Sequence, residues 1–155
     1  MKQQFMRKAI RISIVKMRAN LGGPFGAVVV KSGRIVGSGW NQVTSTNDPT
    51  AHAEICAIRE ACRRLNTFHL EECELYTSCE PCPMCLAAIY WARIKNVYYG
   101  NTRKDAARIE FDDDLIYREI ATPIWRRKIP MKQLLRHEAL VAFKEWQIKP
   151  DRIRY

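Results

Sequence analysis

Apolar and polar residues repeat with a helical period over the first twenty positions of the chain. One stripe contains Phe5, Ala9, Ile12 and Lys16, with Met6, Ile10 and Met17 beside it, and the opposite face is basic. The run Gly22-Gly23-Pro24 follows and is expected to end the helix. We therefore predict an amphipathic helix over about residues 3–19.

Two short runs rich in β-branched residues come next. Residues 27–30 read Ala-Val-Val-Val, and residues 35–40 read Ile-Val-Gly-Ser-Gly-Trp. The tripeptide Lys-Ser-Gly of residues 31–33 separates them, and glycine accepts the positive φ that a tight hairpin turn requires. The pattern predicts an antiparallel hairpin with its turn at Gly33.

Helical and extended patterns then alternate, which favours an α/β fold built in layers. After a polar loop over residues 41–50, we expect a helix at about 51–65, a strand at 74–78, a helix at 83–93 and a strand at 96–100. The last third is less regular. There we expect a helix that begins within 111–117, a weak strand at 131–135, a final helix marked by Leu140, Phe143 and Trp146, and an extended end at 149–155.

Length and composition fit one globular domain, residues 1–155, which is large enough to bury a core without disulfides. No apolar run approaches the roughly 18 residues of a membrane helix, and no secretory signal follows the basic N-terminus. We therefore expect a cytoplasmic protein with no membrane partner. The six cysteines are expected to be thiols, some of them bound to a metal.

Positive charge is concentrated at the two ends of the chain. The formal net charge is +10, to which residues 1–20 contribute +6, residues 21–117 contribute −2 and residues 118–155 contribute +6. Basic ends suit a nucleic acid or another anionic ligand, and they also suit a solvated surface. The basic residues are not interleaved with stacking aromatics, which favours the solvated surface.

Two motifs carry the candidate chemistry: His-Ala-Glu at residues 52–54 and Pro-Cys-Pro-Met-Cys at residues 81–85, each at the start of a predicted helix. Cys82 and Cys85 share one helical face, and a helix N-terminus favours thiolates. With His52 they supply three ligands, and a catalytic zinc takes three and leaves a fourth position for water. Glu54 is placed to move a proton from that water to a leaving amino group.

Cys79 leaves an alternative open, because Cys79 and Cys82 also have the Cys-x-x-Cys spacing. If Cys79 were a fourth ligand, the result would be a closed Cys₃His site, which is typical of a structural zinc module without catalysis.

The motif pair His-x-Glu and Pro-Cys-x-x-Cys is the signature of the zinc nucleobase deaminases. From about residue 5 to residue 100 the chain resembles the cytidine-deaminase-like superfamily, through residues 22–28, 40–41, 47–54 and 77–85. The resemblance implies a three-layer α/β/α sandwich on a mixed five-stranded sheet. It also implies one zinc per subunit held by His52, Cys82 and Cys85, with Cys79 outside the ligand set and Glu54 catalytic.

Two branches of that superfamily share these motifs: the tRNA adenosine deaminases and the bacterial guanine deaminases. The basic ends and the isoelectric point near 9.6 favour the tRNA branch. The stretch from Phe111 to Tyr117, with its Asp-Asp-Asp triplet, and the aromatic C-terminus at Tyr155 resemble the guanine branch instead. With these segments, the resemblance to the guanine deaminases covers nearly the whole chain.

The guanine branch implies a set of roles that we state as expectations. Guanine would be contacted by Phe25, Asn41, Ala53, Asp113 and Tyr155: Asn41 would use both amide groups on the ring edge, and Phe25 and Tyr155 would sandwich the purine. Asp113, or its neighbour Asp112, would accept from the 2-amino group and help it leave. The resemblance also implies a homodimer that exchanges the segment after about Pro123, which delivers Tyr155 to the partner.

Overall fold

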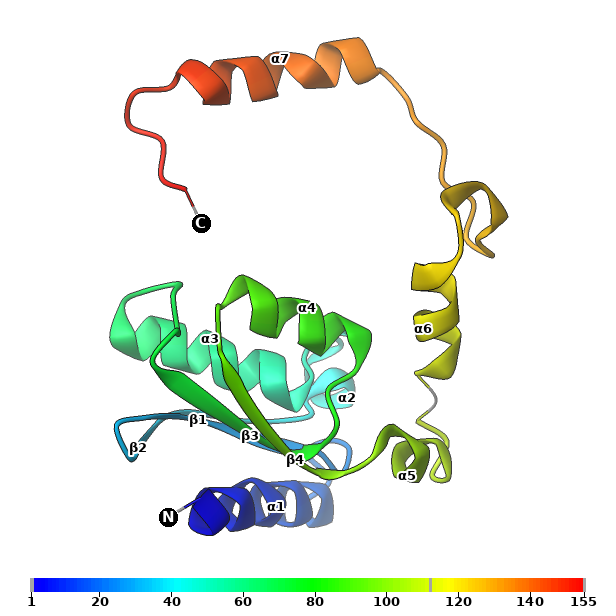
Figure 1. Cartoon of the computed structure of the whole chain (residues 1–155). Coiled ribbons are helices and arrows are strands. Elements are labelled where there is room, and N and C mark those ends of the chain that lie inside the picture. The colour runs from blue at the N-terminus through cyan, green and yellow to red at the C-terminus, as the bar shows by residue number, and fades with distance from the viewer. Residues whose placement is uncertain (1, 112, 155) are drawn as a thin grey trace. The chain divides into compact units, whose positions relative to one another are not determined.

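The structure is a computed structural model, which describes residues 2–111 and 113–154. The chain divides into two compact units, Met1–Asp113 and Asp114–Tyr155. The first unit contains a sheet with helices on both of its faces (Figure 1). Both candidate motifs lie in this unit, whereas Asp112 and Tyr155 lie outside the described residues.

The described residues form four strands in one mixed sheet: β1 (Gly26–Lys31), β2 (Arg34–Trp40), β3 (Cys73–Cys79) and β4 (Asn96–Asn101). The order is β2-β1-β3-β4, in which β1 pairs antiparallel with β2 and β3, and β3 pairs parallel with β4. The expectation of five strands is therefore wrong for this part of the chain. Residues 131–135 form no strand, and the sequence Met-Lys-Gln-Leu-Leu has none of the β-branched residues that favour one.

The turn between β1 and β2 has the geometry expected from the sequence. Lys31 pairs with Arg34, which leaves two turn residues. Ser32 has a φ of 48° and Gly33 a φ of 74°, so both lie in the left-handed region. Two positive φ values in a two-residue loop match the right-handed twist of the flanking strands. The predicted hairpin is confirmed, and Ser32 shares the unusual backbone conformation with Gly33.

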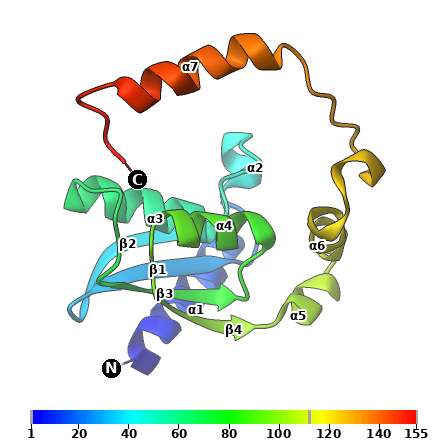
Figure 2. The ribbon, with the colours of Figure 1, turned by 45° about the horizontal axis from the view of Figure 1, so that its top comes forward.

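Helices cover both faces of the sheet, as the predicted sandwich requires (Figures 1 and 2). Helix α1 (Lys2–Arg18) packs on one face through Phe5 and Ala9, which meet Val28, Val30 and Tyr76. Helices α3 (Ala53–Leu65) and α4 (Pro83–Trp91) lie on the other face. There the alternate side chains of β1 and β3, including Ala27, Val29 and Leu75, form a second core cluster.

Shorter helices connect these elements. Helix α2 (Val43–Thr46) lies within the expected loop. Helix α5 (Arg103–Ala107) follows β4 and was not predicted; its N-terminus is closed by reciprocal hydrogen bonds between Thr102 and Asp105, a capping box. This signal of a helix start is readable in the sequence, but only five helical residues follow it.

The second unit contains α6 (Asp114–Ala121), the 3₁₀ helix η1 (Ile124–Arg126) and α7 (Arg136–Ile148). The helices expected near residues 111–117 and around Phe143 are confirmed. None of the described residues of this unit is buried. Among the described helices of the whole chain, none is long and apolar enough to span a membrane.

Close packing of α3 on β2 sets the position of the first motif. A Cβ atom added to Gly39 would lie 2.2 Å from the carbonyl oxygen of Ala53, and one added to Gly37 would lie 2.3 Å from that of Ala57. The strand therefore presents glycines where the helix presents alanines, and the two backbones approach closely. This contact fixes the N-terminal turn of α3, which carries Glu54.

We predict that Gly39→Ala lowers the free energy of unfolding by about 3 kcal/mol or more, because the added methyl group must separate α3 from β2. Gly33→Ala is the matched control. It has open space around the added Cβ and bears only the cost of a positive φ, roughly 1–2 kcal/mol. Urea unfolding measures both values. Equal losses at the two positions would contradict the close packing of helix on strand.

Candidate active site

The first motif lies at the N-terminus of α3. His52 is the N-cap, with extended backbone angles, and Glu54 lies in the first helical turn. The preceding turn is held by Asp48, whose carboxylate accepts hydrogen bonds from the backbone N–H and the hydroxyl of Thr50. Ala53 is fully buried at the first helical position, where backbone N–H groups have no partner within the helix. A ligand at this end of α3 would therefore meet an unused donor.

The second motif forms the N-terminus of α4 in the same way. Cys82 is the N-cap, Pro83 occupies the first turn, and Cys85 follows three residues after the cap. Cys82 makes no side-chain capping hydrogen bond, although the nearby backbone N–H of Cys85 helps to lower the pKa of its thiol. Proline is favoured at the first helical position because no N–H is needed there. The N-terminal end of the helix dipole stabilises the thiolate form of Cys82.

The two helix ends bring three soft ligands together. The His52 Nδ1 atom lies 3.5 Å from the Cys82 sulfur and 3.6 Å from the Cys85 sulfur, and all three ligand atoms lie within 4.8 Å of one another. For a tetrahedral zinc, with bonds of about 2.0 Å to nitrogen and 2.3 Å to sulfur, these separations should be roughly 3.5 Å. The ligand types and the spacing therefore both fit zinc.

The protonation of the cluster is coupled to metal binding. The interaction between the Cys82 and Cys85 side chains lowers the pKa of Cys82 to about 4 and raises the pKa of Cys85. The hydrogen bond between His52 and Cys82 raises the pKa of His52. Zinc takes all three ligands in their deprotonated forms. Its binding would therefore displace the proton of the Cys85 thiol.

Glu54 is buried beside this cluster. One carboxylate oxygen, Oε2, accepts from the Cys85 thiol at 3.5 Å, and the other, Oε1, accepts from the Thr77 hydroxyl at 3.2 Å. Burial raises the pKa of Glu54, because the charged form is poorly solvated there. A carboxylate with a raised pKa beside a metal site is suited to accept and return protons near neutral pH. The contact with Thr77 was not anticipated from the sequence.

Cys79 lies apart from the three ligands. Its thiol donates to the backbone carbonyl of Thr102 over 3.7 Å, and burial raises its pKa to about 11. Among the described residues, the ligand cluster contains His52, Cys82 and Cys85 and does not include Cys79. The geometry therefore favours three ligands with an open fourth position over a closed Cys₃His set.

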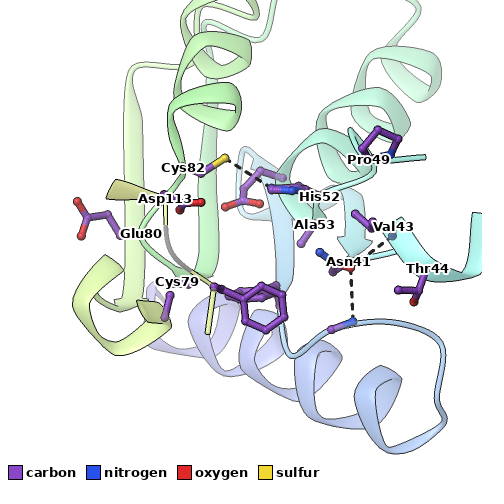
Figure 3. A pocket seen from close by; sticks show the side chains of 15 residues that line it. Asn41, Val43, Thr44, Pro49, His52, Ala53, Cys79, Glu80, Cys82 and Asp113 are labelled. Carbon is purple, nitrogen blue, oxygen red and sulfur yellow. Dashed lines mark hydrogen bonds between the residues drawn. The ribbon is translucent and has the colours of Figure 1, made fainter. Parts of the chain in front are cut away.

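A cavity of about 280 Å³ opens next to the cluster (Figure 3). Ligand pockets usually start at about 300 Å³, so this volume suits a molecule as small as a single base. The cavity is lined by Gly23, Phe25, Asn41, Val43, Thr44, Pro49, His52, Ala53, Glu54, Cys79, Glu80, Cys82, Ala106, Phe111 and Asp113. All the expected contact residues that the structure describes, Phe25, Asn41, Ala53 and Asp113, are present in this lining.

Asn41 is almost fully buried, and its side chain is fixed by the backbone. The Oδ1 atom accepts from the N–H of Gly23 at 3.4 Å and from the N–H of Val43 at 3.3 Å (Figure 3). A carbonyl oxygen has two lone pairs, so these bonds use its accepting capacity. Both the oxygen and the nitrogen of the Asn41 amide were expected to contact a ligand. Because the oxygen is already bonded to the backbone, only the N–H donors remain for that contact.

An aromatic pair forms one wall of the cavity. The rings of Phe25 and Phe111 meet edge to face, with centroids 4.9 Å apart and planes at 85°. Phe25 was expected in the site, whereas Phe111 served only as a marker of family resemblance. Phe111 is far from Phe25 in the sequence, so local spacing does not predict this contact. The position of Phe111 directly before an acidic triplet was a signal that could have marked it as a site residue.

Comparisons with known proteins agree with this geometry. The family model described as the cytidine and deoxycytidylate deaminase zinc-binding region matches residues 1–101. The chain is 51% identical to a guanine deaminase of Bacillus subtilis over 145 residues, which covers 94% of this chain and 93% of that protein. The X-ray structure of the Bacillus subtilis enzyme matches with a TM-score of 0.96 at 49% identity, covering 99% of this chain and 98% of that chain.

Two further relatives are similar over less of the chain. A tRNA-specific adenosine deaminase of Aquifex aeolicus is 48% identical over 101 residues, covering 64% of this chain and 65% of that protein. A solved guanine deaminase of Nitrosomonas europaea is 33% identical with a TM-score of 0.67, covering 70% of this chain and 63% of that chain. The similarity to the tRNA enzyme thus leaves about a third of the chain unmatched.

We predict that Cys79→Ser retains one zinc per chain, whereas Cys82→Ser loses most of its zinc. The reason is that Cys79 lies outside the ligand cluster and Cys82 lies within it. Metal analysis of purified proteins measures the zinc content, and thermal unfolding checks that both variants fold. Loss of zinc from Cys79→Ser to the same extent would support the closed Cys₃His site instead.

Proposed function

The chain belongs to the cytidine and deoxycytidylate deaminase family of zinc enzymes, and on that premise we propose that it hydrolyses guanine to xanthine and ammonia. The observation that carries the choice of guanine is the extent of the similarity. Identity to the Bacillus subtilis guanine deaminase continues over 94% of the chain, well past residue 101, where the family model ends.

The residues of the site divide the work of this reaction. His52, Cys82 and Cys85 would hold the zinc, and their two thiolates would balance its charge. The bound metal supplies a Lewis acid that lowers the pKa of a water molecule. Glu54 would take a proton from the water and deliver it to N3 of guanine, while the water oxygen would bond to C2. Glu54 would then move the remaining proton of the new C2 hydroxyl to the amino group, which would leave as ammonia and leave xanthine behind.

The cavity walls would orient the purine. Asn41 donates its amide N–H groups to acceptors on the ring edge, and the backbone N–H of Ala53 adds a donor at the start of α3. Phe25 provides an apolar face for the ring, and Tyr155 would cover the opposite face. Asp113 accepts from the 2-amino group and assists its departure. Asp112 is the alternative for this role.

Deamination of adenosine in tRNA is the second candidate function. It is favoured by the net charge of +10 and by the similarity to the tRNA-specific enzyme of Aquifex aeolicus. An enzyme of this kind would bind its RNA through phosphate contacts, so its affinity would fall steeply as salt rises. Conversion of a free base would not share that salt dependence.

We further propose that two copies of the chain form a dimer and exchange the segment after about Pro123. The described part of the second unit has no buried residue, although it contains many large apolar side chains, including Trp125, Leu134, Phe143 and Ile148. A segment that cannot form its own core needs another surface to cover it. A second copy would meet that need, and its exchanged end would bring Tyr155 to the partner's cavity.

The cellular setting follows from the same proposal. All six cysteines are free thiols, and a site with two thiolate ligands requires reducing conditions before the metal binds. We place the enzyme in the cytoplasm, in the breakdown and salvage of purine bases.

We predict that the zinc-loaded protein converts guanine to xanthine, which the absorbance change measures directly. Glu54→Gln keeps the volume of the side chain and removes its ability to carry a proton, so it should lower kcat by about 10²–10⁴-fold with zinc retained. Cytosine, adenine, guanosine and a tRNA anticodon hairpin complete the panel. Conversion of the hairpin with guanine unchanged would assign the tRNA branch, and full activity of Glu54→Gln would exclude the proposed proton transfer.

A second prediction concerns the exchanged segment. Deletion of residues 150–155 should abolish most activity and leave the melting temperature nearly unchanged, because the tail completes a site and forms no core of its own. Light scattering should show a dimer for both proteins. Parallel losses of activity and melting temperature would instead assign the tail a structural role.

Mixed dimers make this test sharper. After the Glu54→Gln protein and the deletion protein are unfolded and refolded together, half of the dimers should be mixed. Exchange predicts that one site in each mixed dimer combines Glu54 with an intact tail, which restores about a quarter of the wild-type activity. Without exchange, no mixed dimer contains a complete site, and the activity stays at the level of the parent variants.

A further inference from the structure

A buried hydroxyl lies on an apolar face of the sheet. Thr77 is in the middle of β3, opposite Ala27 of β1 and Tyr99 of β4, and only 1% of it is exposed. On the same face, two residues earlier in the strand, Leu75 belongs to the core beneath α3. Valine has nearly the shape of threonine and would avoid the cost of burying a hydroxyl that lacks a hydrogen bond.

The bond that satisfies this hydroxyl is made to the Glu54 carboxylate. Thr77 Oγ1 donates to Oε1 at 3.2 Å, whereas the Cys85 thiol donates to Oε2 at 3.5 Å. The two oxygens of Glu54 are therefore held from opposite sides. Oε1 is directed toward the sheet, and Oε2 is directed toward the ligand cluster.

The two bonds respond differently to zinc. A cysteine that binds zinc is a thiolate and has no proton to donate, so a bound zinc would remove the hydrogen bond from Cys85 to Glu54. The hydroxyl of Thr77 is neutral and is not a ligand, so its bond to Oε1 persists.

From the buried bond between Thr77 Oγ1 and Glu54 Oε1 we propose that Thr77 is a positioning residue, which holds Glu54 with Oε2 directed at the reacting groups. Thr77 transfers no proton itself; it limits the rotation of the carboxylate in the metal-bound enzyme. The inference rests on the proposed proton transfer by Glu54. It explains how the Glu54 carboxylate, which lies next to two cysteine thiolates, would keep the orientation that proton transfer requires.

The neighbouring residue supplies a matched control. Ser78 is also buried in β3, and its hydroxyl oxygen accepts from the backbone N–H of Gly26 at 3.0 Å. This bond ties β1 to β3, and the hydroxyl lies on the face opposite Thr77. Ser78→Ala therefore removes a buried hydrogen bond of similar kind from the same strand without touching Glu54.

The test compares Thr77→Val with Thr77→Ser and Ser78→Ala, in zinc-loaded protein. Thr77→Val should lower kcat by about 10–100-fold, because a misplaced proton-transfer group loses most of its effect. The KM, the zinc content and the melting temperature should stay close to the wild-type values. Thr77→Ser keeps the hydroxyl and should restore kcat to within about threefold. Ser78→Ala should lower the melting temperature and leave kcat unchanged.

Several results would overturn the proposal. They are an unchanged kcat in Thr77→Val, an equal loss of kcat in Thr77→Ser, or a loss that simply follows the zinc content. If Thr77→Val folds poorly, Thr77→Ala provides the same test with a smaller side chain, and loss of zinc from both would assign Thr77 a role in metal retention instead. Failure of the guanine assignment is separate, because the comparison then uses whichever substrate the wild-type protein converts.

Discussion

Three acidic groups are buried together in this protein, and their mutual repulsion is the constraint on which the site depends. The Cys85 sulfur lies 3.5 Å from Oε2 of Glu54 and within 4.8 Å of the Cys82 sulfur, and Glu54 is almost completely buried. Burial raises the pKa of Glu54, and the interaction with Cys82 together with burial raises the pKa of Cys85, so both groups tend to hold their protons. A bound divalent metal would compensate the negative charges of these groups, so that they could be deprotonated together. The positive ends of the α3 and α4 dipoles would stabilise the same negative charges.

The fold serves this cluster by bringing two distant helix starts to one place. Helix α3 packs closely on β2 because Gly37 and Gly39 let the two backbones approach. Strand β3 ends at Cys79, shortly before α4 begins. The metal ligands therefore come from both helices, and zinc would connect them across the face of the sheet. In such an arrangement, metal binding and the packing of α3 against α4 support each other.

The sequence predicted the parts of the site that depend on local spacing. The motifs at residues 52–54 and 81–85 located the cluster of His52, Cys82 and Cys85, and Gly33 located the hairpin turn. Contacts between distant residues were not accessible in this way. Thr77 looks like any β-branched residue in a strand, and the edge-to-face contact of Phe25 with Phe111 depends on the tertiary fold. The fifth strand was expected from the family resemblance and as a weak strand at residues 131–135, and the described residues do not contain it.

The second unit has a consequence for how the protein is made. None of its described residues is buried, and this part of the chain is synthesised after the sheet domain. In a chain without a partner, the folded sheet domain would be followed by a segment whose apolar side chains are exposed. Under the exchange that we propose, the concentration of the protein in the cell would govern both the number of complete active sites and the risk of aggregation. At low concentration most chains would be monomers, and these would be both inactive and vulnerable to proteases.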